Sequence, residues 1–400
     1  MKQQVAITAV GVVSALGATL DGVREGLFRG DQGGIVRSAG LIPGRECFVA
    51  SVREVLPTCP KGLEKMWSRN VALTLMALRQ IEGRVAAAID KYGRDRIAIV
   101  IGSSTSGISE VESVVRAHCE GRAAPAPYNY RQQQMGTVSL VLSQVLGVVG
   151  PSYTISTACS SSGKVFRAAR NLLRAGLADC VITGGIDSLC GLTIQGFSSL
   201  QLVSDHVTNP FSKNRSGITI GEAAALFVLE RSDVVSGERP VIVRGVGESS
   251  DAYHISSPDP SGAGALAAIR AAFADAEVAA EDVDYVNLHG TGTPHNDLME
   301  ATAVRAVFSG SVQCSSTKPL VGHTLGASGA IEAAFSWMVL TDGQQRLPPH
   351  RFDGEFDPEL PALNLVTAGC AVSSAPRVVL SNSFGFGGSN CALVLSREAA

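Results

Sequence analysis

Four segments of the sequence combine reactive side chains with residues small enough to approach one another closely. The first joins a predicted strand to a predicted helix and carries Cys159 within the run 156–162. A thiol at a helix N-terminus faces unpaired N–H groups and the positive end of the helix dipole, which lower its pKa. A sharp turn between strand and helix also exposes the sulfur. The segment predicts a nucleophilic thiolate, although a single cysteine in such a run is more often a small buried apolar residue.

The second and third segments supply nitrogen and carboxylate groups. His289 directly follows a predicted strand and opens a loop rich in glycine and threonine, the position where ligands bind in open α/β sheets. In the run 315–332, Lys318, His323 and Glu332 stand among small residues. Taken singly, each of these polar groups is more often a surface group or a hydrogen-bonded core group.

The fourth segment, 382–390, is a glycine-rich turn between two predicted strands and contains Phe386. It is either a simple β-turn or a loop whose bare N–H groups approach a ligand. No phosphate-binding loop or complete dinucleotide fingerprint follows a predicted strand. Taken together, a thiolate, two histidines, a lysine and a donor loop are the groups that thioester acyl transfer followed by carbanion chemistry requires.

The elements that must position these groups are short apolar strands separated by helical patterns. Near-continuous apolar strands of this kind are typical of α/β proteins whose sheets are covered on both faces. Gly176 ends the first of two predicted helices. The helices are expected at 160–175 and 327–340, and the strands at 5–10, 96–101, 153–156, 180–183, 224–229, 241–246, 285–288, 312–315, 378–381 and 391–396.

The order of these elements repeats once along the chain. In each half a strand, a turn and a helix precede another strand and a glycine-rich turn, which suggests a duplication. The best polar break lies at 236–240. We therefore expect an N-terminal half, 1–240, with the cysteine segment, and a C-terminal half, 241–400, with the other three segments.

Composition limits the classes of partner. Of the 400 residues, 45% are apolar and only 17% are charged, and the net charge is −3. So little charged surface predicts a large core together with a buried subunit interface, and thus an obligate oligomer. A near-neutral chain has no polybasic field, so neither nucleic acid nor an anionic membrane surface is expected as a partner.

The nine cysteines occur singly, and none has the spacing of a zinc site. They predict reduced thiols in the cytoplasm and no metal. The uncharged run 5–20 is similar to the apolar part of a signal peptide, but Gly11, Ser14 and Gly17 interrupt it. It is too short to span a bilayer, so we interpret it as the first core strand and a turn leading into a helix, with no export.

The four segments together resemble the β-ketoacyl-acyl carrier protein synthases of the thiolase superfamily, in particular the elongating Cys-His-His class. The resemblance extends from Ala6 to the C-terminus and is strongest in three runs: His289–Thr293, the stretch from Ser316 to Ala327, and Asn382–Asn390. It implies duplicated thiolase-like α/β halves layered as α-β-α-β-α. It also implies decarboxylative condensation of malonyl units in fatty-acid or polyketide and polyene elongation, with no bound cofactor. The substrates would arrive on the phosphopantetheine arm of acyl carrier protein.

The family's catalytic roles transfer to six positions of this sequence. Cys159 would accept the acyl chain, and His289 and His323 would stabilise the enolate formed as malonyl thioester loses CO₂. Lys318 would hold the histidine network electrostatically, with Glu332 as its counter-charge. The N–H groups of Cys159 and Phe386 would form the oxyanion hole, and the Phe386 side chain would be the gate that admits acyl chains.

Pocket and partner residues follow from the same resemblance. Thr105 stands where the family often has a bulky aliphatic residue in the acyl pocket, and Met135 would reach toward a partner's pocket across a dimer interface. Lys61 and Lys65 match a basic carrier-docking patch, whereas Glu64 and Gln201 do not, and an ordinary solvated surface explains the two lysines equally well. The expected assembly is a homodimer, or a heterodimer with a homologous chain-length-factor-like chain.

The sequence departs from the family pattern at two places, and two other functional classes are weighed against the synthase. Ser216 replaces the usual acidic residue after an arginine, and 221–225 has alanines where the family has glycines, so local loop structure is open there. A non-catalytic chain-length-factor-type subunit is the alternative, but such subunits usually lack the cysteine that this chain keeps. An acyl-CoA thiolase would need a second cysteine in the glycine-rich loop, where this chain has Phe386. The run 156–166 resembles synthases of polyene-type pathways more than housekeeping ones.

Overall fold

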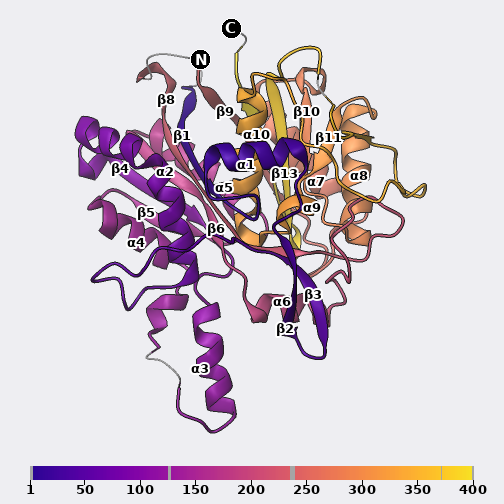
Figure 1. The fold of residues 1–400 in the computed structure, drawn as a ribbon. Helices are drawn as coiled ribbons and strands as arrows, with labels where there is room; N and C mark the ends of the chain where they lie inside the picture. Colours follow the sequence, from indigo (N-terminus) through magenta and orange to yellow (C-terminus); the bar gives the residue numbers. More distant parts are fainter. Residues whose placement is uncertain (1–2, 125–127, 235–238, 371, 399–400) are drawn as a thin grey trace.

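The computed structural model describes residues 3–124, 128–234, 239–370 and 372–398. Its main sheet runs through eleven strands (Figure 1). In spatial order these are β12 (Asn364–Leu365), β11 (Gln313–Ser316), β10 (Tyr285–Leu288), β13 (Val378–Gly385), β14 (Ser389–Ser396), β9 (Val241–Ser250), β1 (Val5–Val13), β8 (Ala223–Arg231), β6 (Cys180–Asp187), β4 (Ile97–Gly102) and β5 (Ser152–Ile155).

The sheet consists of two halves with the same pattern of pairing. In the N-terminal half β1, β8 and β6 are antiparallel neighbours, and β6, β4 and β5 are parallel. In the C-terminal half β9, β14 and β13 are antiparallel neighbours, and β13, β10 and β11 are parallel. The halves join through β1 and β9, which pair at Ala6 with Ile242 and at Ile7 with Val241. The repeat predicted from the order of elements is therefore a repeat of topology.

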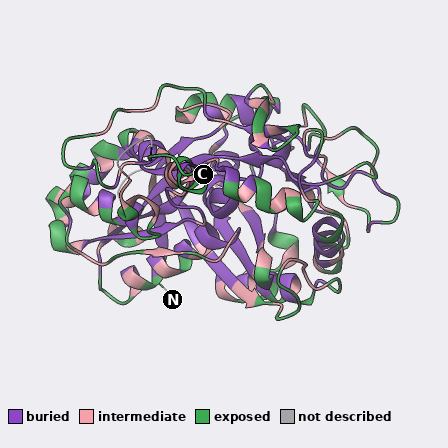
Figure 2. Ribbon diagram, turned by 90° about the horizontal axis from the view of Figure 1, so that it is seen from below, coloured by how far each residue is buried: buried purple, intermediate pink, exposed green. Residues whose placement is uncertain are grey.

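Two buried helices lie between the half-sheets. Helix α5 (Ser161–Arg174) packs on β6 and β4, helix α10 (Ser328–Thr341) packs on β13, and the two helices contact each other. Figure 2 shows buried strands through the centre of the molecule and exposed helix faces on its outside. On the outer faces, α2 (Arg69–Tyr92) covers β1 and β8, and α7 (Ala263–Ala276) covers β9 and β14. The layers therefore follow the predicted α-β-α-β-α order.

Glycine makes the contact between the central helices possible. A Cβ on Gly329 of α10 would lie 2.4 Å from the backbone nitrogen of Gly163 of α5, well inside van der Waals contact. Both helices begin next to a predicted functional segment, so this close crossing brings the Cys159 turn and the His323 loop together.

The remaining elements complete the two halves. The uncharged run near the N-terminus forms β1 and a turn into α1 (Leu20–Arg29), which Thr19 caps. A small sheet contains β2 (Ile35–Ile42), β3 (Arg45–Ala50) and β7 (Ile220–Gly221), and α3 extends away from the body (Figure 1). The other helices are α3 (Ser109–Cys119), α4 (Thr137–Leu146), α6 (Gly191–Ser199), α8 (Pro294–Phe308) and α9 (Lys318–Val321). Among the helices of the described ranges, none combines the length and apolar character needed to cross a bilayer.

The predicted elements agree with this structure closely. The strand 285–288 coincides with β10, and the helix 160–175 differs from α5 by one residue at each end. The proposed division at residue 240 stays a prediction, because residues 236–238 of the polar break lie outside the described residues.

Candidate active site

Cys159 lies in a tight turn between β5 and α5. Ala158 has a φ of +52°, in the left-handed region that residues other than glycine rarely adopt. The Thr157 N–H donates to Ser161 Oγ at 2.9 Å, which fixes the turn from the first residue of the helix. The thiol group is buried. The predicted sharp turn is therefore present, but it holds the sulfur inside the protein.

The prediction of a lowered thiol pKa is wrong for this structure. Burial raises the pKa of Cys159 to about 11, because a thiolate loses its hydration there. The Lys318 ammonium and the Phe386 N–H, which is hydrogen-bonded to the sulfur, act in the opposite direction, whereas Asp187 and Glu332 raise the pKa further. The resting side chain is therefore a thiol at neutral pH.

His289 and His323 converge on this thiol. The cysteine sulfur and one ring nitrogen from each histidine all lie within 4.8 Å of one another. The two rings meet edge to face, with centroids 5.2 Å apart and an interplanar angle of 87°. Burial and the nearby Lys318 ammonium lower the pKa of both histidines well below the usual value, so both rings are neutral at pH 7.

Hydrogen bonds determine which nitrogen of each ring carries the proton. Lys318 Nζ lies 3.2 Å from His289 Nδ1, and the Leu325 N–H donates to His323 Nδ1 at 3.2 Å. A charged ammonium and a backbone N–H can each only donate a hydrogen bond. Both Nδ1 atoms are therefore acceptors. Each neutral ring therefore carries its proton on Nε2, which makes both Nε2–H groups donors.

Lys318 and Glu332 form a buried ion pair behind His289. Lys318 Nζ donates to Glu332 Oε1 at 2.5 Å, and both side chains are almost completely buried. Burial raises the pKa of Glu332 to about 7, although the Lys318 ammonium opposes this shift. The ammonium beside His289 also disfavours a metal ion on the Cys159–His289–His323 triad, because a second cation there would be repelled.

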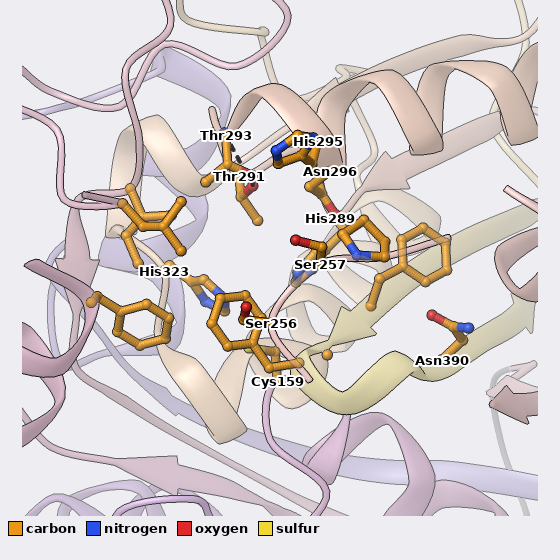
Figure 3. Close-up of a pocket in the computed structure, with 17 residues that line it drawn as sticks. Cys159, Ser256, Ser257, His289, Thr291, Thr293, His295, Asn296, His323 and Asn390 are labelled. Atoms are coloured by element: carbon orange, nitrogen blue, oxygen red, sulfur yellow. Dashed lines mark hydrogen bonds between the residues drawn. The ribbon is translucent and has the colours of Figure 1, made fainter. Parts of the chain in front are cut away.

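These groups line a cavity of about 620 Å³, a volume that includes space open to solvent. Figure 3 shows Cys159 at one end, and Thr293 and His295 at the other. The Phe386 ring packs on Phe197 with centroids 5.2 Å apart. The cavity is lined by Cys159, Phe197, Leu202, Ile218, Ser256, Ser257, Pro258, His289, Thr291, Thr293, His295, Asn296, His323, Phe384, Gly385, Phe386 and Asn390.

Glu300 of α8, which the sequence motifs did not single out, holds the His289 loop. Its carboxylate accepts the N–H groups of His289 at 2.7 Å and of Gly290 at 2.6 Å. Asn382 Nδ2 donates to it as well, at 3.2 Å, and burial raises the pKa of Glu300 to about 7. The signal for it was weak, namely a glutamate on the buried side of a helix that follows a reactive loop.

Asp187, at the end of β6, was also not singled out, because its partners lie far away in the sequence. This buried carboxylate accepts the N–H groups of Ser104, Thr105 and Gly326 at 2.6–3.0 Å. Ser104 and Thr105 belong to the N-terminal half, and Gly326 follows His323 in the C-terminal half. One side chain therefore ties the loops of the two halves together.

The structure does not bring the predicted pocket and docking residues to the cavity. Thr105 is buried with its hydroxyl on Asp187 at 2.8 Å, and Met135 is 41% exposed; neither lines the cavity. The exposure of Met135 shows that it does not fill its own subunit's core. Lys61 and Lys65 are exposed on a segment that contributes no lining residue.

The two departures from the family pattern have local solutions. Arg215, which lacks an acidic residue beside it, pairs with Asp357 at 2.5 Å. Glu222 remains fully buried and pairs with Arg69 at 2.5 Å, and the alanines 223–225 are buried in β8.

Comparison with known proteins matches this architecture. The beta-ketoacyl synthase N-terminal domain matches residues 37–234, and the C-terminal domain matches 241–351. The 3-oxoacyl-[acyl-carrier-protein] synthase 2 of Coxiella burnetii is 30% identical, over 99% of each chain. A ketosynthase from Xenorhabdus doucetiae, solved in complex with its chain length factor, is 40% identical with a TM-score of 0.90, covering 99% of this chain and 98% of that one. The ishigamide ketosynthase/chain length factor is 26% identical with a TM-score of 0.89, covering 100% of both chains. The chain belongs to the beta-ketoacyl synthase family.

Proposed function

We propose that this acyltransferase, a β-ketoacyl synthase, uses Cys159 to carry the growing acyl chain. The single observation that carries the assignment is the convergence of the Cys159 sulfur with two neutral histidines within 4.8 Å. In the first half-reaction the sulfur attacks the thioester of an acyl carrier, and the carrier's C–S bond breaks. The thiol proton leaves Cys159 and the departing carrier thiol gains one, so the exchange needs no net proton.

The second half-reaction makes the carbon–carbon bond. The Nε2–H groups of His289 and His323 donate to the carbonyl oxygen of a malonyl thioester, and the bond to its carboxylate breaks, releasing CO₂. The electron pair of that bond forms an enolate, which attacks the acyl-Cys159 carbonyl. The Cys159–acyl bond then breaks, and the cysteine sulfur takes up a proton as the β-ketoacyl product leaves.

The N–H groups of Cys159 and Phe386 are proposed to stabilise the tetrahedral intermediate. The hydrogen bond from the Phe386 N–H to the cysteine sulfur supports this role, because the sulfur is the atom to which the acyl carbonyl would be attached. Removal of one such donor typically costs about 3 kcal/mol of transition-state stabilisation.

Lys318 is proposed to act through His289 rather than as a base. Its ammonium keeps His289 neutral and holds Nδ1 as an acceptor, so that Nε2 stays a donor. Glu332 compensates the buried lysine charge at 2.5 Å. The Phe386 ring, packed on Phe197, is proposed as the gate to the acyl site, and Thr105 and Met135 are proposed to border the acyl chain when the gate opens.

A second chain is proposed to cover the edge of the main sheet at β5. Exposed apolar side chains are concentrated there, on α4 and its neighbours: Met135, Leu140, Val145, Val149 and Tyr153. Among the described strands, β5 pairs along one edge alone (Figure 1), and its other edge invites pairing with another chain. A dimer through this edge, with an identical or a homologous chain, would also bring Met135 toward the other subunit.

The dimer is tested by light scattering after gel filtration. The expected mass is roughly twice 41.5 kDa for a homodimer. Leu140→Glu, which adds a charge to α4, should weaken the dimer, whereas Leu177→Glu, an exposed leucine beyond the end of α5, should not. A fully active monomer at working concentration would contradict the proposal, and an obligate complex with a homologous chain would define it as a heterodimer.

The acyl donor and the cellular location of the protein are also part of the proposal. An acyl carrier protein is the proposed donor, and Lys61 and Lys65 are the proposed basic contacts for it. The cytoplasm is the proposed location, supported by nine cysteines that are all free. The proposed boundary between the two halves is residue 240. A non-catalytic chain-length-factor role is less well supported, because the thiol and both histidines are retained.

The function is tested by mass spectrometry after incubation with a panel of acyl carrier thioesters. We expect an acyl adduct on the peptide that contains Cys159, none in Cys159→Ala, and elongation when malonyl carrier is added. The set of trapped chains also identifies the preferred substrate. Absence of any adduct, both alone and with a homologous partner, would favour the non-catalytic role.

A further inference from the structure

Lys164 is a cation in a place where the helix disfavours one. It lies in the first turn of α5, within the turn that follows Cys159, and it is half-buried. A positive side chain at a helix N-terminus opposes the dipole of the helix. An unfavourable local position indicates that a tertiary contact compensates for it.

That contact is with Ser389, on the other side of the active site. Lys164 Nζ donates to Ser389 Oγ at 2.7 Å. The Ser160 hydroxyl, next to Cys159, lies 3.0 Å from the same Ser389 oxygen and 2.8 Å from the Thr157 carbonyl oxygen. A continuous set of polar contacts therefore links Lys164, Ser389 and the two ends of the Cys159 turn.

Ser389 is the residue that closes the glycine-rich hairpin. It pairs with Gly385 across the hairpin, and the loop 386–388 lies between them. Gly387 and Gly388 both have φ values above +70°, so the loop has little conformational stiffness of its own. Its far side is held by the Gly387 N–H, which donates to the Ile255 carbonyl at 2.9 Å. Its near side faces Cys159, where the Phe386 N–H meets the sulfur.

We propose that Lys164 is a positioning residue that holds the glycine-rich hairpin against the Cys159 turn through Ser389. It touches no substrate and acts through Phe386. The distance between the hydrogen-bonded Cys159 turn and the glycine-rich hairpin loop determines whether the Phe386 N–H lies on the charge that develops during acyl transfer. The expected effect on catalysis rests on the proposed function, whereas the expected effect on the mobility of the hairpin does not.

The structural consequence is measured by hydrogen-exchange mass spectrometry on peptides that cover 384–390. Lys164→Met keeps a long, unbranched side chain, one atom shorter than lysine, and removes the donor, so exchange of these amides should become about tenfold faster. Arg167→Met is the matched control, because it removes an exposed cation from the next turn of the same helix; it should match wild type within about twofold. Equal exchange in Lys164→Met and wild type would overturn the proposal, whether or not the protein is an active synthase.

The catalytic consequence is a split between kcat and KM in the condensation assay. Lys164→Met should lower kcat about tenfold with KM almost unchanged, since a displaced oxyanion donor costs less than the 10²–10³-fold of a deleted one. Lys164→Arg, which restores a charged donor, should recover most of the loss. A rise in KM alone, or the same loss in Arg167→Met, would overturn the positioning role.

A double-mutant cycle with Ser389→Ala tests the route of the effect. If Lys164 acts through Ser389, the double variant should be no slower than the slower single variant, because both substitutions break the same contact. Additive losses would contradict that route. Melting temperatures of all variants identify any that fail to fold, and Lys164→Arg and Ser389→Ala keep the test decisive if Lys164→Met is one of them. If the wild-type protein forms no adduct on Cys159, the proposed function is wrong. The hydrogen-exchange comparison would still test the structural role of Lys164.

Discussion

The two halves of the molecule share one topology but carry different chemistry. After β5 in the N-terminal half, a short turn presents a single thiol before α5 begins. After the corresponding β11 in the C-terminal half, a longer connection presents Lys318 and His323 before α10 begins. After β4 the chain carries serine and threonine hydroxyls, whereas after the corresponding β10 it carries His289.

In the proposed mechanism, this repeated topology separates the nucleophile from the groups that control protons and charge. The cysteine half would supply the covalent attachment point, and the histidine half would supply donors for the substrate carbonyl. The close crossing of α5 and α10 at Gly163 and Gly329 brings the Cys159 turn together with the His323 loop, and the sulfur and both imidazoles line one cavity. The separation also predicts that substitutions in the two halves affect different half-reactions.

The largest effect is expected from loss of the nucleophile. Cys159→Ala should reduce acylation and condensation more than 10³-fold, because no other group can hold the acyl chain. Its melting temperature should stay close to wild type, since alanine fits the same turn. Cys159→Gln, whose amide is similar to the acyl thioester, should still release CO₂ from malonyl carrier. Normal condensation by folded Cys159→Ala would refute the division between the halves.

Loss of either histidine should affect decarboxylation instead. His289→Ala and His323→Ala should each slow CO₂ release about 10²–10³-fold, the typical cost of a deleted donor to a developing oxyanion. Some acyl transfer to Cys159 should remain, because that exchange needs no net proton. Carbon dioxide release and acyl-adduct formation are measured separately in each variant. If one variant loses acylation as completely as Cys159→Ala does, that histidine is the base for the thiol.

The pH dependence of Cys159 alkylation tests the protonation state of the nucleophile in the N-terminal half. The pKa of Cys159 is raised to about 11, so the thiolate is scarce at pH 7 and its fraction increases tenfold per pH unit until the pH nears that value. Alkylation of Cys159 by iodoacetamide should therefore become about 100-fold faster between pH 7 and pH 9. The modified peptide is quantified by mass spectrometry, with the exposed Cys119 as an internal reference. A plateau below pH 9 would show that the helix N-terminus outweighs burial.

The smallest difference is expected between two buried carboxylates: Asp187, which ties loops of both halves together, and Glu300, which holds the His289 loop. Asp187→Asn and Glu300→Gln each replace a carboxylate that accepts several N–H groups, so each should destabilise the protein by about 2–4 kcal/mol. Denaturant unfolding measures that loss. Glu300→Gln should also slow decarboxylation about tenfold at temperatures where the protein is folded, because Glu300 accepts the backbone N–H of His289 itself. An equal effect of both variants on activity would show that the two loops do not differ in role.

The sequence allowed accurate prediction of elements whose signals are local. The strand 285–288 coincides with β10, and the cysteine and glycine-rich turns lie where their small residues indicated. The reactive residues were recognisable because each stands in such a segment. Glu300, Asp187 and Lys164 were not, because their partners lie at least ten residues away and on other elements. Nothing in the spacing of those residues encodes the contact.

The sequence by itself determined which elements form, in what order they repeat, and which side chains are available for chemistry, because propensity and hydrophobic pattern act over a few residues. The tertiary structure decided the protonation state of those side chains. The helix N-terminus predicted a thiolate at Cys159, but the packing around it buries the sulfur and raises its pKa, and the same burial together with Lys318 keeps both histidines neutral. Desolvation depends on every element packed against a group, so it is known only once the two halves have closed around the cavity.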